Sequence, residues 1–135
     1  MKNLDLLAAE AAQKIIAETS HILKASDVEN LVTKTLGVLQ ENGVYACLLF
    51  VFSRSKVESG KTPTDEKKIA KVVQQNLLDV MNKALDKPAS INANAAVALA
   101  FLTTNICADL DTLLLVKQVW EQTLIYARYG AKARS

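Results

Sequence analysis

The chain has 135 residues, which fits one domain of about 100 to 200 residues. Half of the residues are hydrophobic but only 5% are aromatic, with 4 glycines and 2 prolines. This composition favours helices over a sandwich or barrel of short strands joined by turns. The formal net charge is only +2, so the molecule as a whole has no field strong enough to indicate nucleic-acid or membrane binding.

The start of the chain is not expected to be a secretory signal, because Asp5 and Glu10 interrupt its apolar character. The longest apolar run, residues 44–52, is about half the length of a membrane-spanning helix. Cys47 and Cys107 each lie in an apolar stretch and are expected to be buried free thiols, not a disulfide. We therefore expect a soluble, cytoplasmic protein with no membrane contact.

Two helices are predicted in the first third of the chain. The first carries an apolar stripe at spacings of three and four and is expected to end near Ala25. Its stripe comprises Leu4, Leu7, Ala8, Ala11, Ile15 and Ile22. Ser26 and Glu29 form a capping-box pattern at the start of the second helix. The buried face of this second helix is predicted to comprise Val28, Leu31, Val32, Thr35, Leu36 and Leu39.

Asn42 and Gly43 predict the end of the second helix, because both tolerate the left-handed backbone conformation of a helix cap. Residues 44–52 are apolar throughout, so on pattern alone they fit a buried strand or a buried helix. We predict a helix because no second strand-like segment could pair with a strand here. A polar loop follows over residues 53–63, and Thr62 is expected to cap the next helix.

The next helix has the clearest stripe of the chain and is expected to run until the Asp86-Lys87-Pro88 sequence interrupts it. Its stripe comprises Ile69, Val72, Val73, Leu77, Val80, Met81 and Ala84. Ser90 or Asn92 can then cap a short Ala-rich helix. Its residues 95–102 carry no charge, so a fully buried position is expected.

The last helix opens at Asp109 or Asp111. One apolar face comprises Leu113, Val116, Trp120, Leu124 and Ala127, and another comprises Leu114, Ile125 and Tyr129. A terminal helix that is apolar on two faces needs two covering surfaces, and a small domain supplies one. Taken together, these patterns predict an all-α fold, a single-domain bundle of five or six helices over residues 1–135.

The sequence contains no convincing catalytic, metal or cofactor site. His21 is the only histidine and has no Cys or acidic neighbour at metal-ligand spacing. Asp109 and Asp111 are explained by helix capping, and the glycines form no phosphate-binding fingerprint. We therefore predict a protein that is not an enzyme and has no metal or cofactor.

Basic residues are concentrated in two segments of the chain. Residues 54–71 hold six basic and three acidic side chains, and three basic residues with no acid follow Glu121. Lys67, Lys68 and Lys71 share one face of the predicted helix, and repulsion between them favours an anionic partner. A lysine face that contacts only water is the alternative.

One stretch resembles a known family. It comprises Leu36, Leu39, Gln40, Asn42-Gly43-Val44, Leu48, Phe50 and Ser55-Lys56. This stretch is similar to the small α-helical subunit of type III-B (Cmr) CRISPR effector complexes, where a leucine-rich helix runs into Asn-Gly-Leu, a Leu-x-Phe helix and Ser-Lys. The last helix, with Leu124, Tyr126 and Tyr129, fits the same family loosely.

The resemblance implies a non-catalytic structural subunit that stacks on copies of itself and on other Cmr subunits in antiviral defence. Guide and target RNA would then be contacted through their backbones, without base stacking because few aromatic residues are free. The candidate RNA-binding residues are Arg54, Lys56, Lys61, Lys67, Lys68, Lys71, Arg128 and Lys132. Two alternatives stay open: a helical adaptor that binds only proteins, and a small enzyme or ligand carrier with a pocket inside the bundle.

Overall fold

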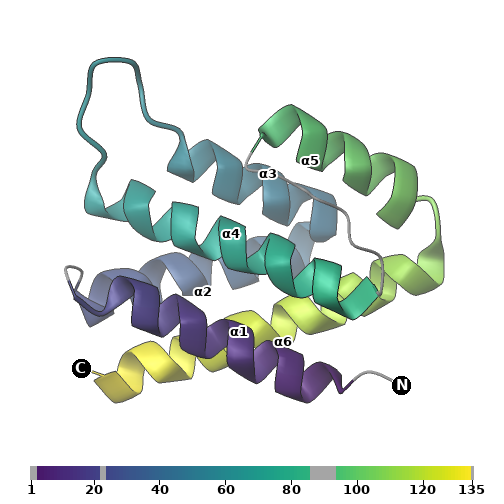
Figure 1. Ribbon diagram of the computed structural model, residues 1–135, viewed down its shortest axis with the longest axis horizontal. Helices are drawn as coiled ribbons and strands as arrows, with labels where there is room; N and C mark the ends of the chain where they lie inside the picture. Colours follow the sequence, from purple (N-terminus) through teal and green to yellow (C-terminus); the bar gives the residue numbers. More distant parts are fainter. Residues whose placement is uncertain (1–2, 22–23, 86–93, 135) are drawn as a thin grey trace.

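The computed structural model describes residues 3–21, 24–85 and 94–134 (Figure 1). Its six α-helices are α1 (Leu4–Thr19), α2 (Ala25–Asn42), α3 (Val44–Ser55), α4 (Asp65–Leu85), α5 (Ala95–Phe101) and α6 (Leu110–Arg134). A π-helical turn, η1 (Leu102–Ile106), follows α5. These ranges contain no strand, so the prediction of an all-α bundle of five or six helices is confirmed.

Two long helices organise the core. α4 packs against α1 and α3, α6 packs against α1 and α2, and α4 and α6 contact each other (Figure 1). Trp120 of α6 is fully buried, and its indole Nε1 donates a hydrogen bond to the carbonyl oxygen of Leu77 in α4 at 2.8 Å. Because this bond satisfies the only polar group of the ring, Trp120 can fill the centre of an aliphatic core.

The first two helices confirm the predicted stripes and correct two predicted ends. α1 ends at Thr19, not near Ala25, because Ser20 takes over a carbonyl that a continuing helix would bond: its backbone N–H and its hydroxyl both donate to the carbonyl oxygen of Ala17, at 3.4 and 2.9 Å. The predicted capping box is wrong, since α2 begins at Ala25 and Ser26 lies inside it. Every predicted buried position of α2 is buried. Ile22 lies outside the described residues.

Gly43 alone links α2 to α3. Its φ of +95° confirms the predicted left-handed φ, whereas its ψ of −173° places it in a region that only glycine readily adopts. This backbone geometry turns the chain sharply, so residues 44–52 start a new helix, as predicted. α3 continues to Ser55, three residues into the segment predicted as a loop.

Replacing Gly43 with Val is therefore expected to destabilise the fold by about 1–3 kcal/mol. A Cβ at this position would meet no atom within 4 Å, so the loss comes from backbone strain and not from a clash. Gly37→Val is the matched control, because Gly37 lies inside α2 with equally open space around it. Urea unfolding measures both variants, and equal stability of the two would contradict the strained turn.

α4 has the predicted stripe but a different cap. Thr64 caps it, since the backbone N–H of Lys67 donates to Thr64 Oγ1 at 3.3 Å, and Thr62 lies in the preceding loop, so that prediction was wrong. The stripe residues are buried except Val72, which is partly buried. The predicted break at Asp86-Lys87-Pro88 and the predicted caps Ser90 and Asn92 lie outside the described residues.

α5 is only partly buried, which corrects the prediction of a fully buried helix. Asn94 caps it by accepting from the N–H of Val97 at 3.2 Å, and only Ala98 of the helix is buried. The reason is its place at the edge of the bundle, where it contacts α3 and η1 (Figure 1). The apolar sequence of α5 showed that the helix could be buried, but it did not show how many other helices would pack against it.

The two free cysteines differ. Cys47 is buried as predicted, and burial raises the pKa of its thiol to about 12, so it stays protonated at physiological pH. Cys107 is exposed, which corrects the prediction, because it follows η1 at the turn into α6.

α6 confirms its predicted buried face, since Val116, Trp120, Leu124 and Ala127 are buried and Leu113 is partly buried. On its other face Leu114 and Tyr129 are 52% and 64% exposed, whereas Ile125 is partly buried against the core. α6 therefore presents apolar surface that the bundle does not cover. None of the helices in the described part of the chain is long and apolar enough to cross a membrane.

Candidate functional site

Three lysines at the start of α4 surround a hollow in the surface, which we call the lysine recess. Lys67, Lys68 and Lys71 line it together with Ser55, Val57 and Pro63, and its volume is about 360 Å³. Lys67 and Lys71 are half-buried, so their carbon stems contribute to the walls while their ammonium groups reach toward water. The sequence-predicted lysine face therefore lies beside an apolar surface.

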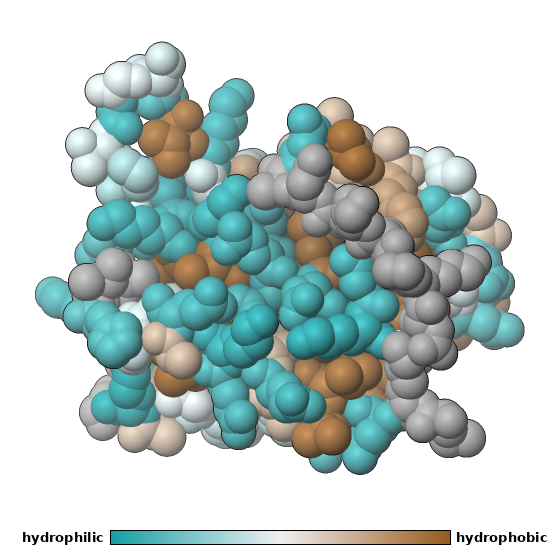
Figure 2. Space-filling view, in the orientation of Figure 1, coloured by the Kyte–Doolittle hydropathy of each residue, from teal (hydrophilic) through white to brown (hydrophobic). Residues whose placement is uncertain are grey.

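The recess forms where the chain turns from α3 into α4. The side chains of Ser53 and Ser55 donate to the carbonyls of Phe50 and Phe52, at 2.7 and 3.2 Å, in the last turn of α3. Loop 56–64 then projects from one end of the bundle (Figure 1), turning at Gly60, whose φ is +80°. Figure 2 shows one hydrophobic group on this projection among residues of mostly intermediate hydropathy. Apart from Pro63, Val57 is the apolar residue of the loop, and it is 41% exposed.

Ser55 connects the recess to a buried amide. Its Oγ lies 3.0 Å from Oε1 of Gln74, a fully buried residue of α4. Nε2 of Gln74 has no hydrogen-bond partner among the described residues, which is a cost of about 1–3 kcal/mol for a buried donor. Gln74 thus fixes the position of Ser55 at the wall of the recess, while its own side-chain N–H groups make no hydrogen bond to the described residues.

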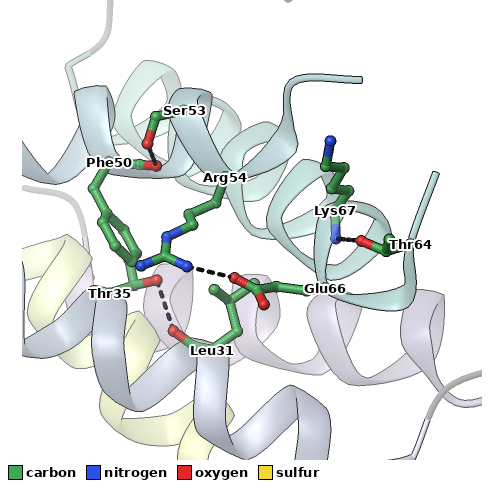
Figure 3. A network of polar contacts seen from close by, with 8 residues as sticks. All are labelled: Leu31, Thr35, Phe50, Ser53, Arg54, Thr64, Glu66 and Lys67. Atoms are coloured by element: carbon green, nitrogen blue, oxygen red, sulfur yellow. Dashed lines mark hydrogen bonds and ion pairs between the residues drawn. The ribbon is translucent and has the colours of Figure 1, made fainter. Parts of the chain in front are cut away.

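The other three basic residues between positions 54 and 71 do not line the recess. The Arg54 guanidinium lies 2.8 Å from Oε1 of Glu66 and 5.0 Å above the ring centre of Phe50. Figure 3 shows this pair facing α2, with the Lys67 side chain pointing away from it. Lys61 forms an ion pair with Glu58 at 2.8 Å within the loop. Lys56 is exposed, directly after α3.

The predicted basic residues of α6 do not join the lysine recess. Lys132 lies 3.8 Å from Glu29 of α2, and Arg128 is half-buried with its Nε lacking a hydrogen-bond partner among the described residues. Neither residue lines the recess. The structure therefore brings together three of the eight candidate residues, with Lys56 adjacent in sequence to the recess wall.

A second hollow, which we call the acidic recess, lies between α2 and the start of α4. Three acids, Asp27, Asp65 and Glu66, line it together with one lysine, Lys34, and its volume is about 330 Å³. Because acids outnumber the lysine, this hollow attracts an RNA backbone less than the lysine recess does. Asp65 and Glu66 also occupy the first turn of α4, where their negative charges complement the helix dipole. A phosphate group is therefore expected to bind the lysine ammonium groups and not the backbone N–H groups at the start of α4.

Sequence reasoning missed three residues of the recess, namely Ser55, Val57 and Pro63. Of these three, only Val57 could have been singled out from the sequence, because it is an apolar residue in an otherwise polar loop. No sequence signal pairs Asp27 with Asp65, since residues far apart in the chain meet there only through the packing of α2 on α4.

Within residues 3–21, 24–85 and 94–134, no three His, Cys, Asp or Glu side chains are grouped so that they could hold a metal ion. Comparison with known proteins adds no family: no family model, curated protein or solved structure matches this chain.

Proposed function

We propose that this protein is a non-catalytic, RNA-contacting subunit of a type III-B CRISPR (Cmr) effector complex, acting in the cytoplasm in antiviral defence. The observation that carries the proposal is the gathering of Lys67, Lys68 and Lys71 on one side of α4. None of the three forms an ion pair with an acid of the described residues. Three uncompensated ammonium groups on one surface favour a polyanion over a neutral partner.

The family resemblance supports the same surface independently. Its residues follow the chain from α2 through the Gly43 turn and along α3, and they end at Ser55 and Lys56. Ser55 is a wall of the lysine recess. The part of the chain that resembles the Cmr small subunit therefore leads to the place where the lysines gather.

Assembly with copies of itself and with other subunits is part of the proposal. Leu110 and Leu114, one turn apart at the start of α6, are 67% and 52% exposed, and Tyr129 near its other end is 64% exposed. Large exposed apolar side chains are typical of protein contact surfaces, so both ends of α6 offer places for another subunit to dock. Repeated copies would present the lysine recess several times along one RNA, which raises the overall affinity through effective concentration.

A helical adaptor that binds only proteins is the second candidate. An apolar groove of about 520 Å³ between α1 and α6 favours it, lined among others by Ala9, Ile16, Ala17 and Tyr126. Such a groove suits an apolar partner and has no need of RNA. The two candidates differ in their response to salt, because phosphate contacts weaken with ionic strength and apolar contacts hardly change.

Purification of the tagged protein from its native cells tests the proposal. We expect it to bring down several other proteins together with small RNAs whose sequences derive from a CRISPR array. A tagged variant with Lys67, Lys68 and Lys71 changed to Gln is expected to retain the proteins and release part of the RNA as the salt concentration rises. Protein partners without any array-derived RNA would contradict the proposal and favour the adaptor.

A further inference from the structure

We propose that the lysine recess holds one unpaired base of the RNA whose phosphates contact Lys67, Lys68 and Lys71. This inference rests on the proposed function and adds a base contact to it, where sequence reasoning expected contacts to the backbone alone. It predicts a binding site for a single nucleotide unit, with its phosphate at the rim and its base inside.

The shape of the recess supports a ligand larger than phosphate. Its volume of about 360 Å³ falls within the range of about 300–1,000 Å³ that is usual for small-molecule sites. Phosphate groups alone need only exposed ammonium groups on an open surface. A hollow beside those groups can therefore hold a part of the ligand that is attached to the phosphate.

The lining of the recess indicates the chemistry of that part. Val57 is 41% exposed to solvent, and Pro63 is also exposed, so the apolar wall is uncovered in the free protein. A nucleobase has a flat, weakly hydrated face and lies next to a phosphate in the chain, which matches an aliphatic wall next to lysines. Since no aromatic residue lines the recess, the contact is weaker than stacking on a ring and tolerates any base.

Ser55 supplies a polar group for the edge of the base. Its one hydroxyl proton is directed to the Phe52 carbonyl and to Oε1 of the buried Gln74, at 3.2 and 3.0 Å, so Oγ is left as a hydrogen-bond acceptor. Each of the four RNA bases carries an N–H group that can donate to such an acceptor, so this contact also fits a site without base preference. The recess thus combines charge, an apolar wall and a hydrogen-bond acceptor within the space of one nucleotide.

The test compares two oligonucleotides of equal charge. An oligoadenylate octamer and an abasic octamer with the same phosphates are titrated into the full chain at low salt, followed by nuclear magnetic resonance. We expect the oligoadenylate to bind about three- to tenfold more tightly, less than an enclosed apolar pocket provides, and to shift the signals of Ser55 and Val57. The abasic octamer should shift the lysine signals and leave those of Ser55 and Val57 nearly unchanged.

Val57→Ser removes one of the two apolar side chains of the wall, leaving Pro63, and changes no charge, so it should at least halve the difference in affinity between the two oligonucleotides. Val97→Ser is the matched control, since Val97 is similarly exposed on α5 and does not line the recess; it should preserve the difference. Equal affinity of the parent protein for both oligonucleotides would overturn the base site. If replacing Lys67, Lys68 and Lys71 by Gln then lowers the affinity for both, the backbone contact still stands. Absence of binding at millimolar concentration also overturns the base site, whereas the proposed function is decided by the RNA content of the native complex.

Discussion

Trp120→Ala is expected to destabilise the protein by about 3–5 kcal/mol, the range for removing a buried aromatic side chain. Trp120 is fully buried and joins the two central helices, because its Nε1 donates to the Leu77 carbonyl across the contact between α6 and α4. Such a loss is a large part of the roughly 5–15 kcal/mol that stabilises a typical domain. Urea unfolding of the parent and the variant measures it directly.

Two further variants separate the causes of this loss. Trp120→Phe keeps most of the ring volume but removes the hydrogen bond, so we expect a smaller loss of about 1–2 kcal/mol. Leu114→Ala is the control on the same helix, because Leu114 is 52% exposed, and its effect should stay within about 0.5 kcal/mol. A loss below 1 kcal/mol for Trp120→Ala would contradict the central role of this residue in the core.

The triple replacement of Lys67, Lys68 and Lys71 by Gln is expected to weaken RNA binding by the assembled complex about tenfold or more at low salt. Each phosphate contact contributes about 0.7–0.9 to the slope of log K against log salt concentration. Loss of three contacts should therefore make this slope shallower by about 2 for each copy engaged. Filter binding of a target RNA to purified complexes across a salt series gives both the affinity and the slope.

Folding should hardly change in this variant, because removing three neighbouring like charges alters helix stability by only a few tenths of a kcal/mol. The matched control changes Lys14, Lys34 and Lys83 to Gln, which removes the same charge from other places: Lys14 and Lys83 lie near Asp79, and Lys34 lines the acidic recess. An equal loss of RNA binding in both variants, or no loss in either, would mean that the lysine recess has no special role.

The helical stripes could be read from the sequence because they depend only on local spacing. All six predicted positions of α2, from Val28 to Leu39, are buried, and the stripe of α4 is reproduced with Val72 partly exposed. Gly43 was predictable for the same reason, since the positive φ at this turn is a property of one residue. The helix ends were less predictable, because several Ser and Thr residues compete to cap a given turn, as Thr62 and Thr64 do before α4.

The tertiary structure alone decided which residues meet across the chain. The sequence indicated the all-α class, the apolar faces of the long helices and the lysine spacing in α4, because periodicity and charge are local properties. It could not indicate that α5 lies at the edge with only one residue buried, that Arg54 pairs with Glu66 away from the lysines, or that Ser55 and Val57 form a recess beside Lys67. Those outcomes depend on how many neighbours each segment gains when the helices pack, a quantity that no short stretch of sequence contains.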